Sequence, residues 1–378
     1  MPPSGASKKT GTRAVAEAAQ RFPIPKVSLM RNDLPTGMTN AQFSMLLSLF
    51  DIDPNSAVFV GASQNFVYRV KHRGTHRIAR ISVMRHRTRA EIQGELEWIE
   101  FLYAKGLPVC APQSTASGAK YAEMAIDGRL YLLAVFEDAA GRKAARGDLT
   151  VDFCDRVGEL IGRMHAAAIE ANATGYKVCR GDWSSSRLLT KDMLETKAPI
   201  GEKFRGSVSK LMREISAIPA TSGNHGLLHG DVNMDNIHIH DGRIQIFDFD
   251  NAEYGYFLQD IVVMLYDSIY SRLVTQIAPD ALISTIKPLW DAMLKSYHKF
   301  NPRLTFSASD LSNFFLLREA IICVHYHRII PTDRWSDPFL LGMRRHVEEG
   351  DHPLNFRRLV EQDQTLEQRR QRAHGPTL

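Results

Sequence analysis

Apolar and polar side chains alternate over several short runs in the first third of the chain, which is the pattern of half-buried β-strands. The runs that we predict as strands are 57–61, 65–71, 76–83, 121–126 and 129–136. Arg73–Gly74 and Asp127–Gly128 separate consecutive runs, and such pairs favour two-residue hairpin turns. The pattern therefore predicts an antiparallel sheet.

Helical spacing appears beside these runs and dominates after Gly141. Thr39 is a suitable N-cap for a helix over 40–50. Residues 91–104 place Leu96, Ile99 and Leu102 on one face, and residues 151–168 are amphipathic. Most later segments have helical spacing as well, so the chain changes from a sheet-rich to a helix-rich composition.

One short β element interrupts the helical part. Residues 237–240 and 243–247 alternate on either side of Asp241–Gly242, which again predicts a hairpin. We therefore expect an α+β, bilobal fold, with a small antiparallel-sheet N-lobe at 37–136 and a mainly helical C-lobe at 137–360. An N-terminal arm at 1–36, rich in Ala, Pro, Ser, Lys and Arg, is expected to be flexible, and 361–378 form a basic tail with three arginines.

Composition excludes several classes of protein. Among the 378 residues 44% are hydrophobic and 24% are charged, which argues against wholesale disorder and fibrous structure. The longest apolar runs, near 130–136 and 261–266, are far shorter than the ~20 residues of a membrane-spanning helix. The four cysteines form no CxxC pair, which argues for a reducing compartment and against a cysteine-built zinc site. We expect a soluble, cytoplasmic protein that does not bind membranes.

Positive charge is concentrated in the first 130 residues, which carry 17 Lys and Arg against 10 Asp and Glu, whereas the rest carries 30 against 32. Between Arg69 and Arg89 there are eight basic residues and no acidic one. Nucleic-acid binding is one interpretation of such a run. A solvated face explains most of these side chains, and a nucleotide triphosphate explains one or two of them better. We therefore do not expect a nucleic-acid partner.

The most informative stretch is residues 229–236, His-Gly-Asp-Val-Asn-Met-Asp-Asn, followed by the hairpin and then by Asp248-Phe-Asp250. Phosphoryl transfer needs a carboxylate to accept the proton of the attacked hydroxyl, and oxygen ligands to hold Mg²⁺ against the phosphates. A loop carrying Asp231 and Asn236, followed by a hairpin that ends in Asp248, can bring these oxygens to one point. The order H-x-D-x-x-x-x-N and then D-F-x repeats the logic of kinase catalytic and metal loops. Asp231 is our candidate catalytic base, and Asn236 and Asp248 are the candidate metal ligands.

Neighbouring polar residues receive supporting roles. His229 is expected to orient the loop by hydrogen bonding to backbone, because the role of base suits Asp231 better. Asp250 is either a second metal ligand or a structural carboxylate. His238 and His240 alternate on a strand without a third ligand nearby, which favours ordinary strand histidines.

Over about residues 55–340 the chain resembles the aminoglycoside phosphotransferase/choline kinase superfamily, most strongly over 229–266. Residues 247–266 are similar to a bacterial branch that includes stress-response kinases and type II homoserine kinases. The resemblance implies a protein-kinase-like bilobal fold. It also implies that Asp260 braces the catalytic loop from the following helix, and that residues 158–165 form a helix behind that loop.

The resemblance also implies a nucleotide site in the N-lobe, with one departure. The strand position that usually carries a phosphate-binding Lys is Arg80 here, and a guanidinium keeps the charge while adding a fork geometry. Its partner from the next helix is expected to be Glu95, with Glu91 as the alternative. The remaining nucleotide-binding candidates are Ser63 and Asn65 in the phosphate loop, and Val135, Phe136 and Glu137 beside the adenine.

The leading hypothesis is a phosphotransferase that uses ATP, or GTP, with Mg²⁺ and a small-molecule hydroxyl acceptor of aminoglycoside, homoserine or amino-alcohol type. One alternative is a Ser/Thr protein kinase of the stress-response type, although Asn233 stands where protein kinases usually carry Lys. Another is a non-catalytic nucleotide- or nucleic-acid-binding protein, which the joint presence of Asp231, Asn236 and Asp248 disfavours. The acceptor and the choice between monomer and dimer stay open at this point.

Overall fold

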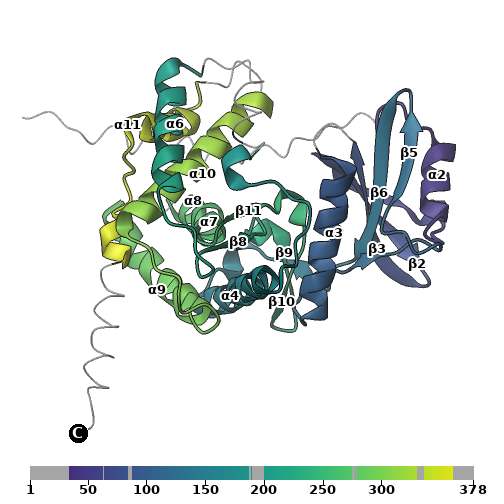
Figure 1. Ribbon diagram of the computed structural model, residues 1–378, viewed down its shortest axis with the longest axis horizontal. Helices are drawn as coiled ribbons and strands as arrows, with labels where there is room; N and C mark the ends of the chain where they lie inside the picture. Colours follow the sequence, from purple (N-terminus) through teal and green to yellow (C-terminus); the bar gives the residue numbers. More distant parts are fainter. Residues whose placement is uncertain are drawn as a thin grey trace, which may run out of the picture.

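The computed structural model describes residues 34–62, 64–83, 87–186, 189, 200–274, 277, 279–329 and 336–360. The predicted tail and nearly all of the predicted N-terminal arm lie outside these residues. Figure 1 shows a sheet-bearing lobe on the right and a helical lobe on the left. The predicted α+β, kinase-like bilobal class is confirmed.

The N-lobe contains a six-stranded antiparallel sheet with the order β1-β2-β3-β6-β4, in which β5 also pairs with β6. Its strands are β1 (Val58–Ala62), β2 (Asn65–His72), β3 (Thr75–Val83), β4 (Pro112–Gln113), β5 (Ala122–Ile126) and β6 (Arg129–Glu137). Five of these six strands were predicted to within about one residue at each end. The hairpin turns have positive φ at Arg73 and Asp127, each followed by a glycine that also has positive φ. The two-residue strand β4 is too short to show a period, and it was not predicted.

Two capped helices cover opposite faces of this sheet (Figure 1). The helices are α2 (Asn40–Ser48), capped by Thr39, and α3 (Arg89–Ala104), capped by Thr88. Along β6, Leu133 and Val135 join the apolar cluster that includes α2, whereas Ala134 and Phe136 join the cluster that α3 shares with the C-lobe. Because neighbouring strand residues alternate in direction, the second face is the one that looks toward the C-lobe.

The C-lobe is built from long helices and three short helical segments, α7, η6 and α8. They are α4 (Val151–Thr174), α6 (Glu202–Ser216), α7 (Leu258–Val263), the π-helical η6 (Met264–Tyr270), α8 (Ser271–Leu273), α9 (Pro279–Tyr297), α10 (Ala308–Ile329) and α11 (Pro338–Glu349). The close approach of α4 and α9 depends on Gly158, where an added Cβ would lie 2.0 Å from the Met293 carbonyl oxygen. The predicted end of α4 at residue 168 is too early, because the apolar stripe continues to Gly175, which ends the helix with φ +74°.

Short strands and 3₁₀ turns carry the loops between these helices. The predicted hairpin is present as β9 (Ile237–His240) and β10 (Arg243–Ile246), and β7 (Arg142–Lys143) pairs with β9. The expectation of a single short β element was incomplete, because β8 (His225–Leu227) also pairs with β11 (Tyr254–Tyr256). The 3₁₀ turns are η1 (Pro54–Ser56), η2 (Arg146–Asp148), η3 (Trp183–Ser185), η4 (Met234–Asn236) and η5 (Phe249–Asn251).

Among the residues that the structure describes, no helix combines the length and the apolar character needed to cross a bilayer.

Candidate active site

The carboxylate of Asp260, in the first turn of α7, binds the backbone of the loop that follows β8. Its Oδ2 accepts the His229 N–H at 2.9 Å and its Oδ1 accepts the Gly230 N–H at 2.8 Å. The Oδ2 atom also lies 3.1 Å from the Nε2 of His165, on α4. Burial acts to raise the pKa of Asp260, but the hydrogen bond and charge of His165 outweigh it and hold the pKa below its ordinary value. A buried, ionised carboxylate therefore fixes the backbone directly before Asp231.

His229 is arranged as a neutral ring between two loops. Its Nδ1 accepts the Asp231 N–H at 3.2 Å, so the proton lies on Nε2, which donates to the Phe247 carbonyl at 3.1 Å. Burial lowers the pKa of His229. The side chain thus joins the catalytic-loop candidate to the segment that leads to Asp248, as a connector between backbones.

Gly230 brings the same two loops into direct contact. Its φ is +80°, and an added Cβ would lie 2.1 Å from the carbonyl oxygen of Asn251, which directly follows the DFD motif. Both features require glycine at this position.

Asp231 and Asn236 are linked through the 3₁₀ turn η4. The Asn236 Nδ2 donates to the Asp231 carbonyl oxygen at 2.9 Å and to its Oδ2 at 3.1 Å. Asn233 begins the turn, since its side chain accepts the Asp235 N–H at 2.8 Å. Asp231 and Asn236, two of the three residues that we predicted to act together, are therefore in contact. The third, Asp248, follows Phe247, whose N–H donates to the Asn236 carbonyl at 3.1 Å.

Asp248 occupies an unusual backbone position at the end of the hairpin. Its φ and ψ are 69° and 68°, in the left-handed region that non-glycine residues seldom adopt. Its Oδ1 lies 3.8 Å from the Arg80 Nη1, and 52% of its side-chain surface remains exposed. The surrounding protein desolvates the carboxyl, Arg80 opposes this, and Asp250, Glu95 and Asp231 add negative charge, so that its pKa is raised to about 7.

This donor set fits a divalent cation. Carboxylate and amide oxygens are the ligands that Mg²⁺ prefers, and Asp248 and Asn236 supply them from adjoining segments. Desolvation is the largest cause of the raised pKa of Asp248, and the negative charges of Asp250, Glu95 and Asp231 add to it. A bound cation would offset these negative charges, and no zinc-type set of His and Cys is involved.

Arg80 and Glu95 form a buried, two-pronged ion pair between β3 and α3. The Arg80 Nη1 and Nη2 each donate to one Glu95 carboxylate oxygen, both at 2.8 Å. The guanidinium also lies over the Phe136 ring, 5.0 Å from its centroid. The alternative partner, Glu91, instead accepts the Thr88 N–H at the start of α3 and lies 3.8 Å from Arg87.

The other nucleotide-binding candidates are distributed differently. Ser63 lies outside the described residues, and Asn65 starts β2 opposite Ser82. Val135 and Phe136 lie inside the sheet, paired with β3 on one side and β4 on the other. The side chain of Val135 belongs to the N-lobe core beside α2. The Val135 side chain therefore lies on the face of the sheet away from the C-lobe, and the predicted contact of its backbone with adenine stays a prediction.

The backbone of Glu137 also pairs, donating to the Ala111 carbonyl at 2.9 Å. The first residues past the sheet are 138–141. There the Ala139 carbonyl accepts from the His238 Nδ1 at 3.0 Å, so His238 is an ordinary strand histidine that holds the connection between the lobes.

Two arginines that sequence reasoning missed hold the DFD segment. The Asp250 carbonyl accepts from Arg180 Nη2 and Arg87 Nη2, each at 2.5 Å. Arg180 also donates to the Ala252 carbonyl at 2.6 Å and to the Glu91 carbonyl at 3.0 Å. The Asp250 carboxylate faces Arg87 Nε at 3.5 Å. This pairing favours the structural role for Asp250 over metal ligation.

A third arginine missed from the sequence touches Asp231 itself. Arg318, on α10, donates from Nη2 to the Asp231 Oδ1 at 3.0 Å. The same group is paired with Asp267 in η6, which accepts from Arg318 Nε at 3.1 Å and also from Nη2. No local motif could reveal this contact, because it joins residues 87 positions apart.

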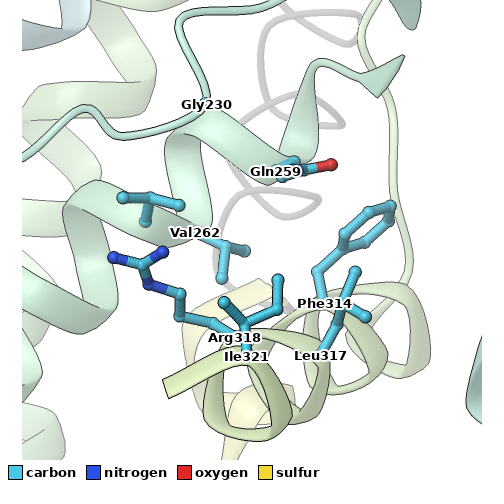
Figure 2. Close-up of a pocket in the computed structure, with 8 residues that line it drawn as sticks. Gly230, Gln259, Val262, Phe314, Leu317, Arg318 and Ile321 are labelled. Carbon is cyan, nitrogen blue, oxygen red and sulfur yellow. The ribbon is translucent and has the colours of Figure 1, made fainter. Parts of the chain in front are cut away.

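A small recess lies beside this arginine, below the loop of Gly230. Figure 2 shows Arg318, Leu317 and Phe314 on one helix, with Val262 and Gln259 on the segment that faces it. The interior measures about 10 Å³, which is room for about one water molecule. The recess is too small to hold an acceptor.

Residues 57–294 match the phosphotransferase enzyme family. The chain belongs to this family. The predicted superfamily and the predicted enzyme class, a small-molecule phosphotransferase with an alcohol group as acceptor, are thereby confirmed, and the non-catalytic alternative is removed.

The chain is also similar to a curated relative, and solved structures share its fold. Amicoumacin kinase of Bacillus subtilis (strain 168) is 25% identical over 297 residues, which cover 77% of this chain and 87% of the relative. An amicoumacin kinase solved with AMP-PNP, Ca²⁺ and Ami superposes with a TM-score of 0.75 at 24% identity, covering 84% of this chain and 96% of the other. A microcompartment-associated aminopropanol kinase gives 0.65 at 16% identity, covering 84% and 100%.

Proposed function

We propose that the enzyme transfers the γ-phosphoryl group of ATP, bound with Mg²⁺, to a hydroxyl of a small molecule of aminoglycoside, homoserine or amino-alcohol type. One observation carries this proposal. Asp231 and Asn236 share two hydrogen bonds, and the Asn236 carbonyl is bonded to the residue before Asp248. These contacts support the proposal that a base and two oxygen ligands act at one place.

In the proposed reaction the acceptor oxygen attacks the γ-phosphorus, a new O–P bond forms, and the bond to the bridging oxygen breaks to release ADP. The acceptor proton passes to the Asp231 carboxylate. His229 does not compete for this proton, because its Nδ1 is occupied by the Asp231 N–H and its Nε2 by the Phe247 carbonyl. Since the transition state is loose, most of the acceleration comes from position and charge.

Asn236 and Asp248 would hold the metal ion. Mg²⁺, when bound, neutralises charge on the β- and γ-phosphates. Arg80 faces the same place from the N-lobe, 3.8 Å from Asp248, and its guanidinium suits phosphate oxygens. Glu95 fixes its direction through both terminal nitrogens.

Charge around Asp231 favours an amino-bearing acceptor. Asp231 and Asp235 both lie close enough to act electrostatically on Asp267, and Arg318 and Lys143 supply positive charge. Negative charge is in excess by one among these five groups, and an ammonium group on the acceptor would complement it. The curated relative named as an amicoumacin kinase supports a small-molecule acceptor in the same way.

The test measures ADP release from Mg-ATP by the full chain against a panel of amino alcohols, homoserine, choline, aminoglycosides and casein-like protein. Asp231→Asn should lower turnover about 10²- to 10⁴-fold. Asp241→Asn is the matched control, because it removes the same charge at a residue that is 88% exposed in the turn between β9 and β10. Unchanged turnover in Asp231→Asn would contradict the assignment of the base, and phosphorylation of casein alone would favour the protein-kinase alternative.

A further inference from the structure

The contact between Arg318 and Asp231 has features that a purely structural ion pair does not need. Arg318 is 12% exposed and already has a full partner in Asp267, which accepts from both Nε and Nη2. The same Nη2 also donates to Asp231 Oδ1 at 3.0 Å. An arginine neutralised by one aspartate thus also holds a second, which is the candidate base.

The elements that carry this arginine are firmly joined. Glu319, the next residue after Arg318, accepts a hydrogen bond from the Tyr266 hydroxyl at 3.2 Å. Tyr266 directly precedes Asp267. Glu319 also lies 3.1 Å from His346 Nδ1 and 3.3 Å from His352 Nε2. Because His352 Nδ1 accepts the Leu354 N–H at 3.1 Å, its Nε2 carries the proton and faces the glutamate as a donor. This cluster is therefore a hydrogen-bonded lock between η6 and α10, and the donor proton on Nε2 argues against a metal site.

These contacts restrict the movement of the Arg318 guanidinium, and the guanidinium in turn restricts the orientation of the Asp231 carboxylate. Its Oδ1 receives Arg318 and its Oδ2 receives Asn236. Each carboxylate oxygen has a second lone pair, and those that remain are the ones that can accept a proton from a hydroxyl.

We propose that Arg318 is a positioning residue for phosphoryl transfer, which holds the Asp231 carboxylate in the orientation that receives the acceptor hydroxyl. This rests on the proposed function, because it requires that Asp231 be the base. The proposal predicts that loss of Arg318 lowers kcat without weakening nucleotide binding. Nucleotide binding depends instead, under the proposed function, on the N-lobe pair Arg80–Glu95.

The first experiment measures ADP release from Mg-ATP with the best acceptor of the panel, or with water where no acceptor exceeds it. Arg318→Met should lower kcat about 10- to 100-fold, the value of a hydrogen bond to a charged group, with KM for ATP unchanged. Asp267→Asn/Arg318→Met should be equally slow, although it leaves no unpaired carboxylate at position 267 to disturb folding. Arg318→Lys should recover part of kcat.

The matched control is Lys287→Met. Lys287 is also 12% exposed and is ion-paired, with Asp291 on α9, so its loss reports the effect of removing a nearly buried cation elsewhere. It should leave kcat per folded enzyme unchanged.

The second experiment adds millimolar methylguanidinium to Arg318→Ala. A positioning role predicts recovery of kcat with methylguanidinium and none with urea, which is similar in shape and uncharged. Arg318→Met with wild-type kcat, or equal effects of the two additives on Arg318→Ala, would overturn the inference. Wild-type ADP release no faster than that of Asp231→Asn would overturn the proposed function, and the inference with it; release that depends on Asp231 but not on Arg318 overturns the inference alone.

Discussion

Arg80 and Glu95 bind each other through two hydrogen bonds of 2.8 Å, with the glutamate fully buried and the arginine 6% exposed. In the superfamily that the chain resembles, this strand position usually carries Lys. The fork of a guanidinium lets Arg80 satisfy both glutamate oxygens and still lie 3.8 Å from Asp248. The substitution therefore changes the geometry of the pair and keeps its position between the lobes.

We predict that Glu95→Gln destabilises the fold by about 3–5 kcal/mol, because it leaves a buried guanidinium without its counter-charge. Arg80→Lys should keep the charge, lose one of the two hydrogen bonds and raise KM for ATP. Urea unfolding and ADP-release kinetics measure the two effects. As a control, Arg69→Lys changes an ion pair with Asp138 whose arginine is 50% exposed, and it should alter stability by less than about 1 kcal/mol. Equal stability of Glu95→Gln and wild type would show that the Arg80–Glu95 ion pair does not stabilise the fold.

The contact between Gly230 and Asn251 gives a second prediction. Gly230→Ala should abolish most activity, since its Cβ would meet the Asn251 carbonyl at 2.1 Å and push the two loops apart. Gly128→Ala is the matched control: its φ is +72°, similarly left-handed, but nothing lies within 4 Å of the added Cβ. It should cost only the backbone strain of about 1–2 kcal/mol and keep kcat. Loss of activity in both variants, to the same degree, would mean that backbone strain and not loop contact is responsible.

His352 gives a prediction on pH. Burial lowers its pKa, with Glu319 acting in the opposite direction. A histidine with a lowered pKa in the folded state contributes stability that is fully present above its unfolded pKa of about 6.5 and is lost as pH falls through the folded value. Below about pH 6.5 the wild type should therefore lose up to about 1.4 kcal/mol per pH unit through this group.

The measurement is urea unfolding of wild type and His352→Gln at pH 7.5 and 5.5. Glutamine can donate to Glu319 without titrating, so the variant should lose less stability between the two pH values. Because His225, His229 and His327 also have lowered pKa values, only the difference between the two proteins is informative. A pH dependence identical in both would exclude His352 as a contributor.

Features with a local signal could be predicted from the sequence. Thr39 caps α2 as predicted, and the turn residues at Asp127 and Asp241 specify hairpins within four residues of chain. The Thr88 cap of α3 was missed, so that helix was predicted to begin two residues too late. The motif that carries Asp231 and Asn236 is equally local, which is why their contact was foreseeable.

The rest depends on contacts between distant segments. Arg180 reaches carbonyl groups 70 to 89 residues away, and Arg318 reaches Asp231 over 87, so no spacing rule connects them. Strands of two or three residues, such as β4 and β8, form because partners are nearby and leave no period in the sequence. The side of the sheet on which Val135 lies follows from the register with β3, which fixes Ala79 opposite it.

The central claim is that Asn236 and Asp248 hold one divalent ion beside Asp231. The most direct measurement is Mn²⁺ binding in the presence of a non-hydrolysable ATP analogue, followed by the EPR signal of free Mn²⁺. Asp248→Asn should weaken binding at least about tenfold, whereas Asp241→Asn, with the same change of charge at an exposed turn position, should bind like the wild type. Equal Mn²⁺ affinity in wild type and Asp248→Asn would contradict the account.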